Sequence, residues 1–384
     1  MNFEFATATR ILFGAGKSAE VPALARSLGQ RVLLVTGRTP ERTRPLHTAL
    51  EAAGLTVIPF AVEQEPTVAL ASEGAQIAQT ESVHVVISIG GGSVLDAGKA
   101  IAALATHPGD PLRFLEVIGA GEPLTKDPLP FLALPTTAGT GAEVTRNAVL
   151  GSPEHRVKVS LRSPRMLPRA AVVDPDLSLG LPPDLTAATG LDALTQLLEA
   201  FVSVRANPLT DALCRDGLVR VAAALPRAYT HGSDRVARAE LALGALYSGL
   251  ALANAGLGAV HGLAGPLGGR FKAPHGAVCA ALLAPVTAVN VEALQAREPD
   301  NPALLRYAEA AHWLTGRSTA TPGDVVPALR QLVAWLNIPG LAAWQVTPDD
   351  FPELVRQARA SSSLKGNPLI LTDAELQAAL LRAL

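Results

Sequence analysis

Several polar residues in the second half of the chain have the types and spacing of a metal site. Asp192 and Gln196 are four residues apart in a segment with helical periodicity, so their side chains lie on one face of a helix. His261 and His275 follow, each beside a glycine and each within a long stretch without charged residues. A carboxylate and two imidazoles are costly to bury unless they are paired or coordinated, which points to a divalent metal. Histidines that only satisfy backbone groups in a packed core fit the spacing slightly better, so spacing alone does not decide.

A glycine-rich segment in the first half has the features of a phosphate-binding loop. Gly91, Gly92 and Ser93 follow an apolar run and precede a helical pattern. Consecutive glycines let the backbone turn sharply and bring N–H groups close to an anion, and the dipole of the following helix favours negative charge there. Ser93 and Asp96 have the spacing of a capping box that opens this helix. We interpret the segment as a pyrophosphate cradle, because a plain strand-to-helix turn needs only one glycine.

A second polar loop covers residues 135–143. It contains Thr136, Thr137 and Thr140 and follows another short apolar run. Parallel sheets bind ligands at the carboxyl ends of their strands, so these threonines are candidates for cofactor contacts. A solvated turn is an equally good interpretation of this loop taken alone.

The first half of the chain alternates short apolar runs with helical patterns. The predicted strands cover residues 31–36, 55–60, 83–89, 129–134 and 170–173, and the predicted helices cover 19–28, 43–53, 68–80 and 94–105. Continuous apolar strands that alternate with helices indicate an α/β fold with a parallel, Rossmann-like sheet covered on both faces.

From residue 181 onward the strand signals disappear. The predicted helices there cover residues 185–204, 208–224, 236–255, 261–266, 278–289, 302–314, 324–336 and 373–384. We therefore expect a dinucleotide-binding α/β domain over residues 1–181 and an all-α metal and substrate domain over residues 182–384, with a cleft between them.

The composition narrows the expected partners and compartment. The chain has 32 basic and 34 acidic residues and no long basic run, so nucleic acid is not an expected partner. Its two cysteines, Cys214 and Cys279, supply neither a disulfide framework nor a zinc cluster, which favours a reducing compartment. The first residues do not have the pattern of a signal peptide. Glycine, proline, asparagine and histidine interrupt the long uncharged stretches, so we expect a cytoplasmic protein with buried helices and no membrane hairpin.

Five motifs resemble those of the iron-containing alcohol dehydrogenase family. They are GGGSVLDAGK at 90–99, PTTAGTGAEVT at 135–145, GLDAL at 190–194, HGLAGPLGG at 261–269 and PHG at 274–276. The resemblance runs from ILFGAG near the N-terminus to NPLILT near the C-terminus. It implies an N-terminal dinucleotide-binding domain, a C-terminal helical domain and an NAD(P)-dependent oxidoreductase that interconverts an alcohol with its aldehyde or ketone.

The resemblance also implies metal ligands. The family uses one aspartate and three histidines, and Asp192, His261 and His275 match three of these four positions. The fourth is Gln196, whose neutral amide oxygen is a poorer donor to iron or zinc than an imidazole. A further family histidine, thought to lie near the nicotinamide and help move protons, is Gly265 here. With a divalent metal bound, the pKa of the alcohol would fall and hydride would pass from carbon to nicotinamide.

The implied cofactor contacts come from several loops. Besides the glycine loop, Asp96 and the three threonines, Lys158 matches a family lysine near the cofactor or substrate. Gly37 and Arg38 stand where many NAD-specific members end a strand with an aspartate. Without the carboxylate and with a cation beside it, this site can accept the 2′-phosphate of NADP. We therefore favour NADP as the cofactor and keep NAD as the alternative.

Two alternatives remain open. A metal-independent reductase similar to maleylacetate reductases is favoured by Gln196, and a non-catalytic nucleotide-binding protein is favoured by Gln196 together with Gly265. By family analogy we expect a small alcohol or carbonyl substrate and a homodimer or larger homo-oligomer.

Overall fold

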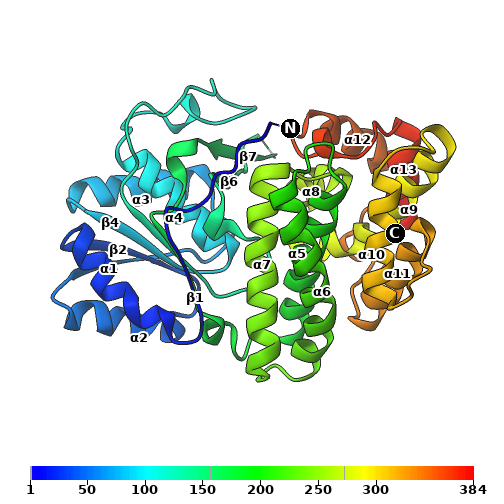
Figure 1. The fold of residues 1–384 in the computed structure, drawn as a ribbon. Coiled ribbons are helices and arrows are strands. Elements are labelled where there is room, and N and C mark those ends of the chain that lie inside the picture. Colours follow the sequence, from blue (N-terminus) through cyan, green and yellow to red (C-terminus); the bar gives the residue numbers. More distant parts are fainter. Residues whose placement is uncertain (1, 156, 272) are drawn as a thin grey trace. The chain divides into compact units, whose positions relative to one another are not determined.

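The computed structural model describes residues 2–155, 157–271 and 273–384, and the chain divides into two compact units (Figure 1). The sheet unit consists of Thr7–Thr137 and Gly141–Leu179. The helical unit consists of Gly180–Leu384 together with Ala138–Thr140 and the residues before Thr7. The predicted α/β fold with a parallel sheet, followed by a helical half, is confirmed.

The sheet unit is built on six parallel strands in the order β1-β8-β5-β4-β2-β3. The strands are β1 (Ile11–Phe13), β2 (Arg31–Thr36), β3 (Thr56–Ala61), β4 (Val85–Gly90), β5 (Phe131–Pro135) and β8 (Ala170–Val173). The chain passes from β2 outward to β3 and then returns to the other side of β2 to form β4. Ligands of open parallel sheets bind at the carboxyl ends of the strands where the strand order reverses, which here lies between β2 and β4.

Helices cover both faces of this sheet. The helices are α1 (Val21–Leu28), α2 (Pro40–Ala52), α3 (Val68–Thr80) and α4 (Gly92–Ala105). Successive residues of β2 alternate between the two faces: Leu34 packs with residues of α1 and α2, and Leu33 packs with residues of α3 and α4. Burial on both faces explains why the central strands are continuous apolar runs, with all six residues of β4 buried.

A hairpin of two antiparallel strands adds to the sheet unit and was absent from the sequence prediction. It consists of β6 (Asn147–Ser152) and β7 (Val157–Arg162), with Asn147 opposite Arg162. Its buried residues, including Ala148, Leu150 and Val159, pack in one cluster with residues of α3 and α4.

The described residues of Gly180–Leu384 contain helices and no strand. The helices are α5 (Pro183–Val202), α6 (Pro208–Thr230), α7 (Arg235–Ala255), α8 (Ala259–Phe271), α9 (His275–Arg297), α10 (Ala303–Thr315), α11 (Val325–Trp335), α12 (Phe351–Ala360) and α13 (Asp373–Arg382). The predicted helices 261–266 and 278–289 were too short: α8 continues past Pro266 to Phe271, and α9 extends beyond the prediction at both ends. The sequence prediction omitted α12.

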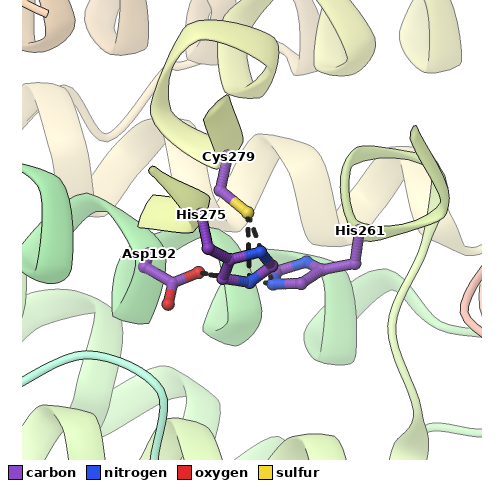
Figure 2. Close-up of side chains that lie close together, drawn as sticks. All are labelled: Asp192, His261, His275 and Cys279. Atoms are coloured by element: carbon purple, nitrogen blue, oxygen red, sulfur yellow. Dashed lines mark hydrogen bonds and ion pairs between the residues drawn. The ribbon is translucent and has the colours of Figure 1, made fainter. Parts of the chain in front are cut away.

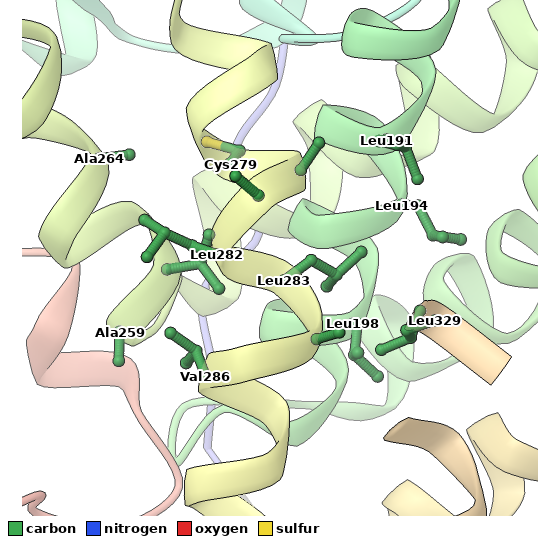
Figure 3. Packing of buried hydrophobic residues seen from close by; sticks show 14 of the residues in the cluster. Leu191, Leu194, Leu198, Ala259, Ala264, Cys279, Leu282, Leu283, Val286 and Leu329 are labelled. Atoms are coloured by element: carbon green, nitrogen blue, oxygen red, sulfur yellow. The ribbon is translucent and has the colours of Figure 1, made fainter. Parts of the chain in front are cut away.

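Helix α9 runs through the core of the helical unit (Figure 3). Leu283 lies toward Leu194 and Leu198 of α5, and Leu282 lies toward Ala264 of α8. Helices α7 and α9 are long and apolar enough to span a membrane by length and composition alone. Their most apolar windows are 61% and 94% buried, respectively, so α9 in particular is packed as a core helix.

The N-terminal segment belongs to the helical unit through contacts with α7. The Asn254 side chain accepts a hydrogen bond from the Ala6 N–H at 2.7 Å and donates one to the Ala6 carbonyl at 3.0 Å. The side-chain amide of Asn254 thus satisfies both the N–H and the carbonyl of Ala6, as a neighbouring strand would.

Candidate functional site

Helix α5 places three polar side chains on one side of the helical core. Asp192, Gln196 and Glu199 follow at intervals of four and three residues, which keeps them on one face of the helix. Asp192 and Gln196 are almost fully buried, and Glu199 is buried nearly as deeply. Leu194, Leu197 and other apolar neighbours on α5 fill the core around them.

Four side chains from α5, α8 and α9 converge (Figure 2). Asp192, His261, His275 and Cys279 each offer a ligand atom, and these atoms all lie within 4.8 Å of one another. His275 is the first residue of α9, and Cys279 follows one helical turn later, so both point to the same side. The sequence prediction that the aspartate and both histidines lie together agrees with this geometry. It missed Cys279, whose signal was its position four residues after His275.

Glu199 orients His261. Its Oε2 lies 2.6 Å from Nδ1 of His261, and its Oε1 accepts a hydrogen bond from the Val260 N–H at 2.7 Å. Nε2 of His261 is then the ring nitrogen that faces Asp192 and Cys279. A carboxylate behind a histidine is the usual outer support of a metal ligand, because it fixes the ring and its tautomer. The sequence prediction missed Glu199, although it lies on the same face of the helix as Asp192.

One buried carboxylate oxygen in the cluster has no hydrogen-bond partner among the described residues. This atom is Oδ1 of Asp192. It lies 3.4 Å from Nε2 of His261 and 3.8 Å from Nε2 of His275, which is too far for good hydrogen bonds. A buried anionic oxygen without a partner is strongly unfavourable, so the four donors fit a cation bound among them.

The electrostatics of the cluster also favour positive charge at its centre. The sulfur of Cys279 has the largest effect on His275, whose pKa is raised to about 9. Burial disfavours the charged form of His261, but Cys279, Glu199 and Asp192 together raise its pKa well above the ordinary value. Burial likewise opposes ionisation of Asp192, and the two histidines nevertheless lower the pKa of its carboxyl. Protons or a metal ion can supply this positive charge.

Gln196 is engaged elsewhere. Its Oε1 lies 2.8 Å from the Ser248 hydroxyl, within hydrogen-bond distance, and the same hydroxyl also has the Ala245 and Gly139 carbonyl oxygens at 2.8 and 3.3 Å. The amide oxygen is the only atom of glutamine suited to bind a divalent metal, since the amide nitrogen is a donor of hydrogen bonds. The atom that the sequence assigned to the metal is therefore in contact with α7.

The loops predicted to bind the cofactor follow three adjacent strands of the sheet unit. Gly37 and Arg38 follow β2, Gly91 to Ser93 follow β4, and Thr136 and Thr137 follow β5. The Thr136 N–H donates to the Gly90 carbonyl at 2.9 Å, so the last two loops begin side by side. They remain close, because a Cβ on Gly91 would lie 3.5 Å from Cγ2 of Thr137.

The predicted capping box at the start of α4 was wrong. The helix begins at Gly92 with Gly91 as N-cap, so Ser93 lies within the first turn, where its side chain cannot cap the helix. Asp96 instead accepts a hydrogen bond from the Val149 N–H at 3.0 Å and pairs with Lys99 at 3.1 Å. Among the described residues no side chain caps the N-terminus of α4, so its first N–H groups and its dipole are available to bind an anion.

The other predicted site residues are placed as follows. The Arg38 guanidinium donates to the backbone carbonyl of Glu63, and Lys158 on β7 pairs with Glu65 at 2.7 Å. Thr140 belongs to the helical unit, whereas Thr136 and Thr137 belong to the sheet unit. Gly265 lies on α8, one turn after His261, and a Cβ there would meet nothing within 4 Å.

Comparisons with known proteins cover both units of the chain. Residues 8–175 match the family model described as iron-containing alcohol dehydrogenase, and residues 186–384 match the model of the C-terminal part of the same family. Alcohol dehydrogenase 4 of Saccharomyces cerevisiae is 37% identical over 87% of this chain and 85% of its own length. A 1,3-propanediol dehydrogenase of Citrobacter freundii is 36% identical over 88% of both chains. The crystal structure of a 1,3-propanediol oxidoreductase has a TM-score of 0.92 and 33% identity over the full length of both chains.

Proposed function

The chain belongs to the iron-containing alcohol dehydrogenase family, and from this premise we infer that it is an oxidoreductase that interconverts an alcohol with its aldehyde or ketone by NAD(P)-dependent hydride transfer. The observation that carries the proposal is the convergence of Asp192, His261, His275 and Cys279 around an unpartnered carboxylate oxygen in the helical unit. The uncapped helix at the carboxyl end of β4 supplies the second requirement, a site for a dinucleotide phosphate.

In this proposal, Asp192, His261 and His275 hold a divalent metal. The metal supplies Lewis acidity that lowers the pKa of an alcohol hydroxyl or polarises a carbonyl. Glu199 keeps the proton on Nδ1 of His261, so that Nε2 carries the lone pair needed by a ligand. The burial of Asp192 and His261 limits the access of water to this side of the cluster.

We propose that the loops after β2, β4 and β5 bind NADP in preference to NAD. The backbone N–H groups of Gly92 and Ser93 face the pyrophosphate, and Thr136 and Thr137 contact the cofactor beside them. Gly37 leaves room, and Arg38 supplies positive charge, for a phosphate on the adenosine ribose. The roles of Thr140 and Lys158 in cofactor binding are part of the same proposal.

The cofactor preference has a direct test. Replacing Gly37→Asp restores a carboxylate that accepts hydrogen bonds from ribose hydroxyls and repels a 2′-phosphate. We expect the ratio of kcat/KM for NADP+ to that for NAD+ to fall roughly tenfold or more. Arg38→Gln should lower the same ratio by removing the cation. A ratio unchanged in both variants would contradict the assignment of this loop to the adenosine ribose.

The activity itself is tested with purified protein and a panel of alcohols that includes ethanol and 1,3-propanediol. Reduction of NADP+ or NAD+ is followed by nicotinamide absorbance in metal-free protein and after addition of zinc or ferrous ions. We expect turnover that depends on added metal. Binding of nucleotide without turnover at any metal loading would overturn the proposal.

A metal-independent reductase is the second candidate. The contact between Gln196 and Ser248 favours it, because it shows one predicted ligand engaged elsewhere. Oδ1 of Asp192 argues against it, since without a cation this buried oxygen has no hydrogen-bond partner among the described residues. Full carbonyl reduction by stringently metal-free protein would decide for the second candidate.

We also propose that the protein works in a reducing compartment such as the cytoplasm. Cys214 and Cys279 are both free and buried. Two unpaired thiols agree with a compartment in which disulfides do not form.

A further inference from the structure

We infer that Cys279 is the fourth ligand of the metal site, which makes the site an Asp-His-His-Cys centre that prefers zinc to ferrous iron. This inference rests on the proposed function only in assuming that the cluster holds a divalent metal. It assigns to Cys279 the place that the sequence assigned to Gln196.

Four of the six distances between the donor atoms agree with those of a tetrahedral zinc site, and the other two are no longer than 4.8 Å. Zinc bonds of about 2.0–2.1 Å to nitrogen or oxygen and about 2.3 Å to sulfur separate tetrahedral ligands by about 3.4 Å for nitrogen and oxygen and by about 3.6 Å for nitrogen and sulfur. In the structure Sγ of Cys279 lies 3.7 Å from Nε2 of His261 and 3.6 Å from Nε2 of His275. Oδ1 of Asp192 lies 3.4 and 3.8 Å from the same two nitrogens.

A hydrogen-bonded cluster without a metal explains this arrangement less well. A neutral thiol has one hydrogen for two rings at almost equal distance, whereas a thiolate could accept from two protonated rings, so the two sulfur distances alone do not decide. Oδ1 of Asp192, in a residue that is 1% exposed, has no hydrogen-bond partner among the described residues. This orphaned oxygen is a second observation, independent of the cysteine, that points to a missing cation at the same place.

The fold holds Cys279 in position. The residue is completely buried. It lies one turn before Leu282 and Leu283 on α9, in the same buried cluster (Figure 3). His275, one turn earlier on the same helix, has 38% of its side chain exposed. The pair therefore presents its donor atoms to one side of α9, with the sulfur inside and the imidazole at the border to solvent.

Charge and donor chemistry favour zinc. The Asp192 carboxylate and a Cys279 thiolate together carry two negative charges, which neutralise a divalent cation in a buried site. Thiolate and imidazole ligands suit zinc, and nitrogen and sulfur sites generally bind zinc more tightly than ferrous iron. Gln196 could contribute only a neutral oxygen, and that oxygen lies within hydrogen-bond distance of the Ser248 hydroxyl.

The first test needs no variant. Metal-free full-length protein is loaded with one equivalent of cobalt(II), which reports its ligands by absorption. A cobalt–thiolate bond gives an intense charge-transfer band in the near ultraviolet, and tetrahedral coordination gives strong visible bands. We expect both kinds of band. Cobalt binding at full stoichiometry without the near-ultraviolet band would overturn the inference.

The second test compares the two buried cysteines. In Cys279→Ser we expect the charge-transfer band to be lost and the zinc affinity, measured against a chromophoric chelator, to fall roughly 100-fold or more. Cys214→Ser is the matched control, because this cysteine is equally buried in the helical unit but lies outside the cluster. It should keep the band and the affinity. Retained zinc affinity in correctly folded Cys279→Ser would overturn the inference.

The metal-binding measurements and the activity assay can fail separately. Zinc bound through Cys279 in a protein that turns over no alcohol would contradict the proposed function and leave this inference standing. Metal-dependent turnover by a cobalt form that lacks the sulfur band would contradict this inference alone.

Discussion

At the scale of single residues, the contact between Glu199 and His261 holds one of the metal-site histidines in place. Both groups are buried, and the 2.6 Å separation is that of a charge-assisted hydrogen bond. The second oxygen of Glu199 binds the Val260 N–H, which anchors the carboxylate to the start of α8. Glu199 therefore fixes the direction in which Nε2 of His261 points.

Replacing Glu199→Gln should weaken metal binding without removing a metal ligand. The amide has half the acceptor capacity of the carboxylate and no charge, so we expect zinc affinity to fall by about 10–100-fold. Competition with a chelator measures this. The exposed Glu154→Gln serves as control and should leave the affinity unchanged. Equal zinc affinities of Glu199→Gln and wild type would contradict the role of Glu199 in orienting His261.

Glu143 makes the stability of the sheet unit depend on pH. Burial raises the pKa of its carboxyl to about 7 from an ordinary value of 4.5, although its own backbone N–H and Lys99 lower it. Between these two values the folded chain holds the proton more tightly than the unfolded chain. The free energy of unfolding therefore decreases as the pH rises from about 4.5 to about 7.

Glu143→Gln should remove this dependence. Wild type should lose on the order of 3 kcal/mol in the free energy of unfolding between about pH 5 and about pH 8, and the variant should not show this loss. Urea unfolding at the two pH values measures the loss. Glu154→Gln, at an exposed position, should show the same loss as wild type. Parallel pH profiles for Glu143→Gln and wild type would show that the buried carboxyl does not titrate in this range.

The sequence allowed part of the site to be predicted, for reasons that lie in individual residues. His261 and His275 stood out as polar groups within uncharged stretches, and the resemblance to the family's ligand positions decided for a metal site that includes Asp192. Cys279 did not stand out, because cysteine is common in apolar cores and its burial needs no explanation. Glu199 was overlooked for another reason: only the fold brings α8 against α5.

At the scale of elements, the packing of α4 against β4 fixes the position of the glycine loop that joins them. Gly98 allows the helix to lie against the strands, because a Cβ there would come within 2.0 Å of the Ser88 hydroxyl and 2.8 Å of the Phe131 ring. The Ser88 hydroxyl in turn donates to the Val94 carbonyl at 3.0 Å, in the first turns of α4. The position of the helix N-terminus thus depends on a residue outside the loop.

Gly98→Ala should therefore destabilise the protein and weaken cofactor binding together. We expect a loss of about 1–3 kcal/mol in the free energy of unfolding from overpacking. Gly265→Ala is the matched control, since this helical glycine has open space and the change should stabilise by about 0.5–1 kcal/mol. Thermal or urea unfolding distinguishes them. If both variants behaved alike, the close approach of α4 to the sheet would not matter.

Elements differed in how well the sequence predicted them. The strands 31–36 and 170–173 agree with β2 and β8 residue for residue, because strands buried on both faces are continuous apolar runs. In β6 burial alternates but the residue types do not follow it, because the exposed Val149 is apolar and the buried Ser152 is polar, so the sequence shows no clear strand pattern. Helix α12 did carry a signal: Phe351, Leu354, Val355 and Ala358 are buried at helical spacing, and the prediction missed it.

At the scale of the whole molecule, the metal donors and the phosphate loop belong to different units. The four clustered side chains lie in the helical unit, and the loops after β2 and β4 lie in the sheet unit. The net charge produces no strong electrostatic field around the molecule, because 32 basic and 34 acidic residues nearly cancel.

The homodimer or larger homo-oligomer expected from the family resemblance stays a prediction.

Hydrogen exchange should reveal this division. Zinc alone should slow amide exchange mainly in α5, α8 and the start of α9, and NADP+ alone mainly around β2, β4 and α4. At a hundredfold excess over the dissociation constant, each ligand stabilises the residues that it binds by about 2.7 kcal/mol. Mass spectrometry of peptides from the two units measures the effect. Equal protection of both units by zinc would show that they open as one cooperative structure instead.

The pairing of Ala6 with Asn254 spans 248 residues. During synthesis on the ribosome, the sheet unit is complete in sequence once Leu179 has emerged, yet the segment before Thr7 must still wait for α7 to be translated. During translation these two hydrogen bonds can therefore form only after Asn254 of α7 has been made, well after the last residue of the sheet unit.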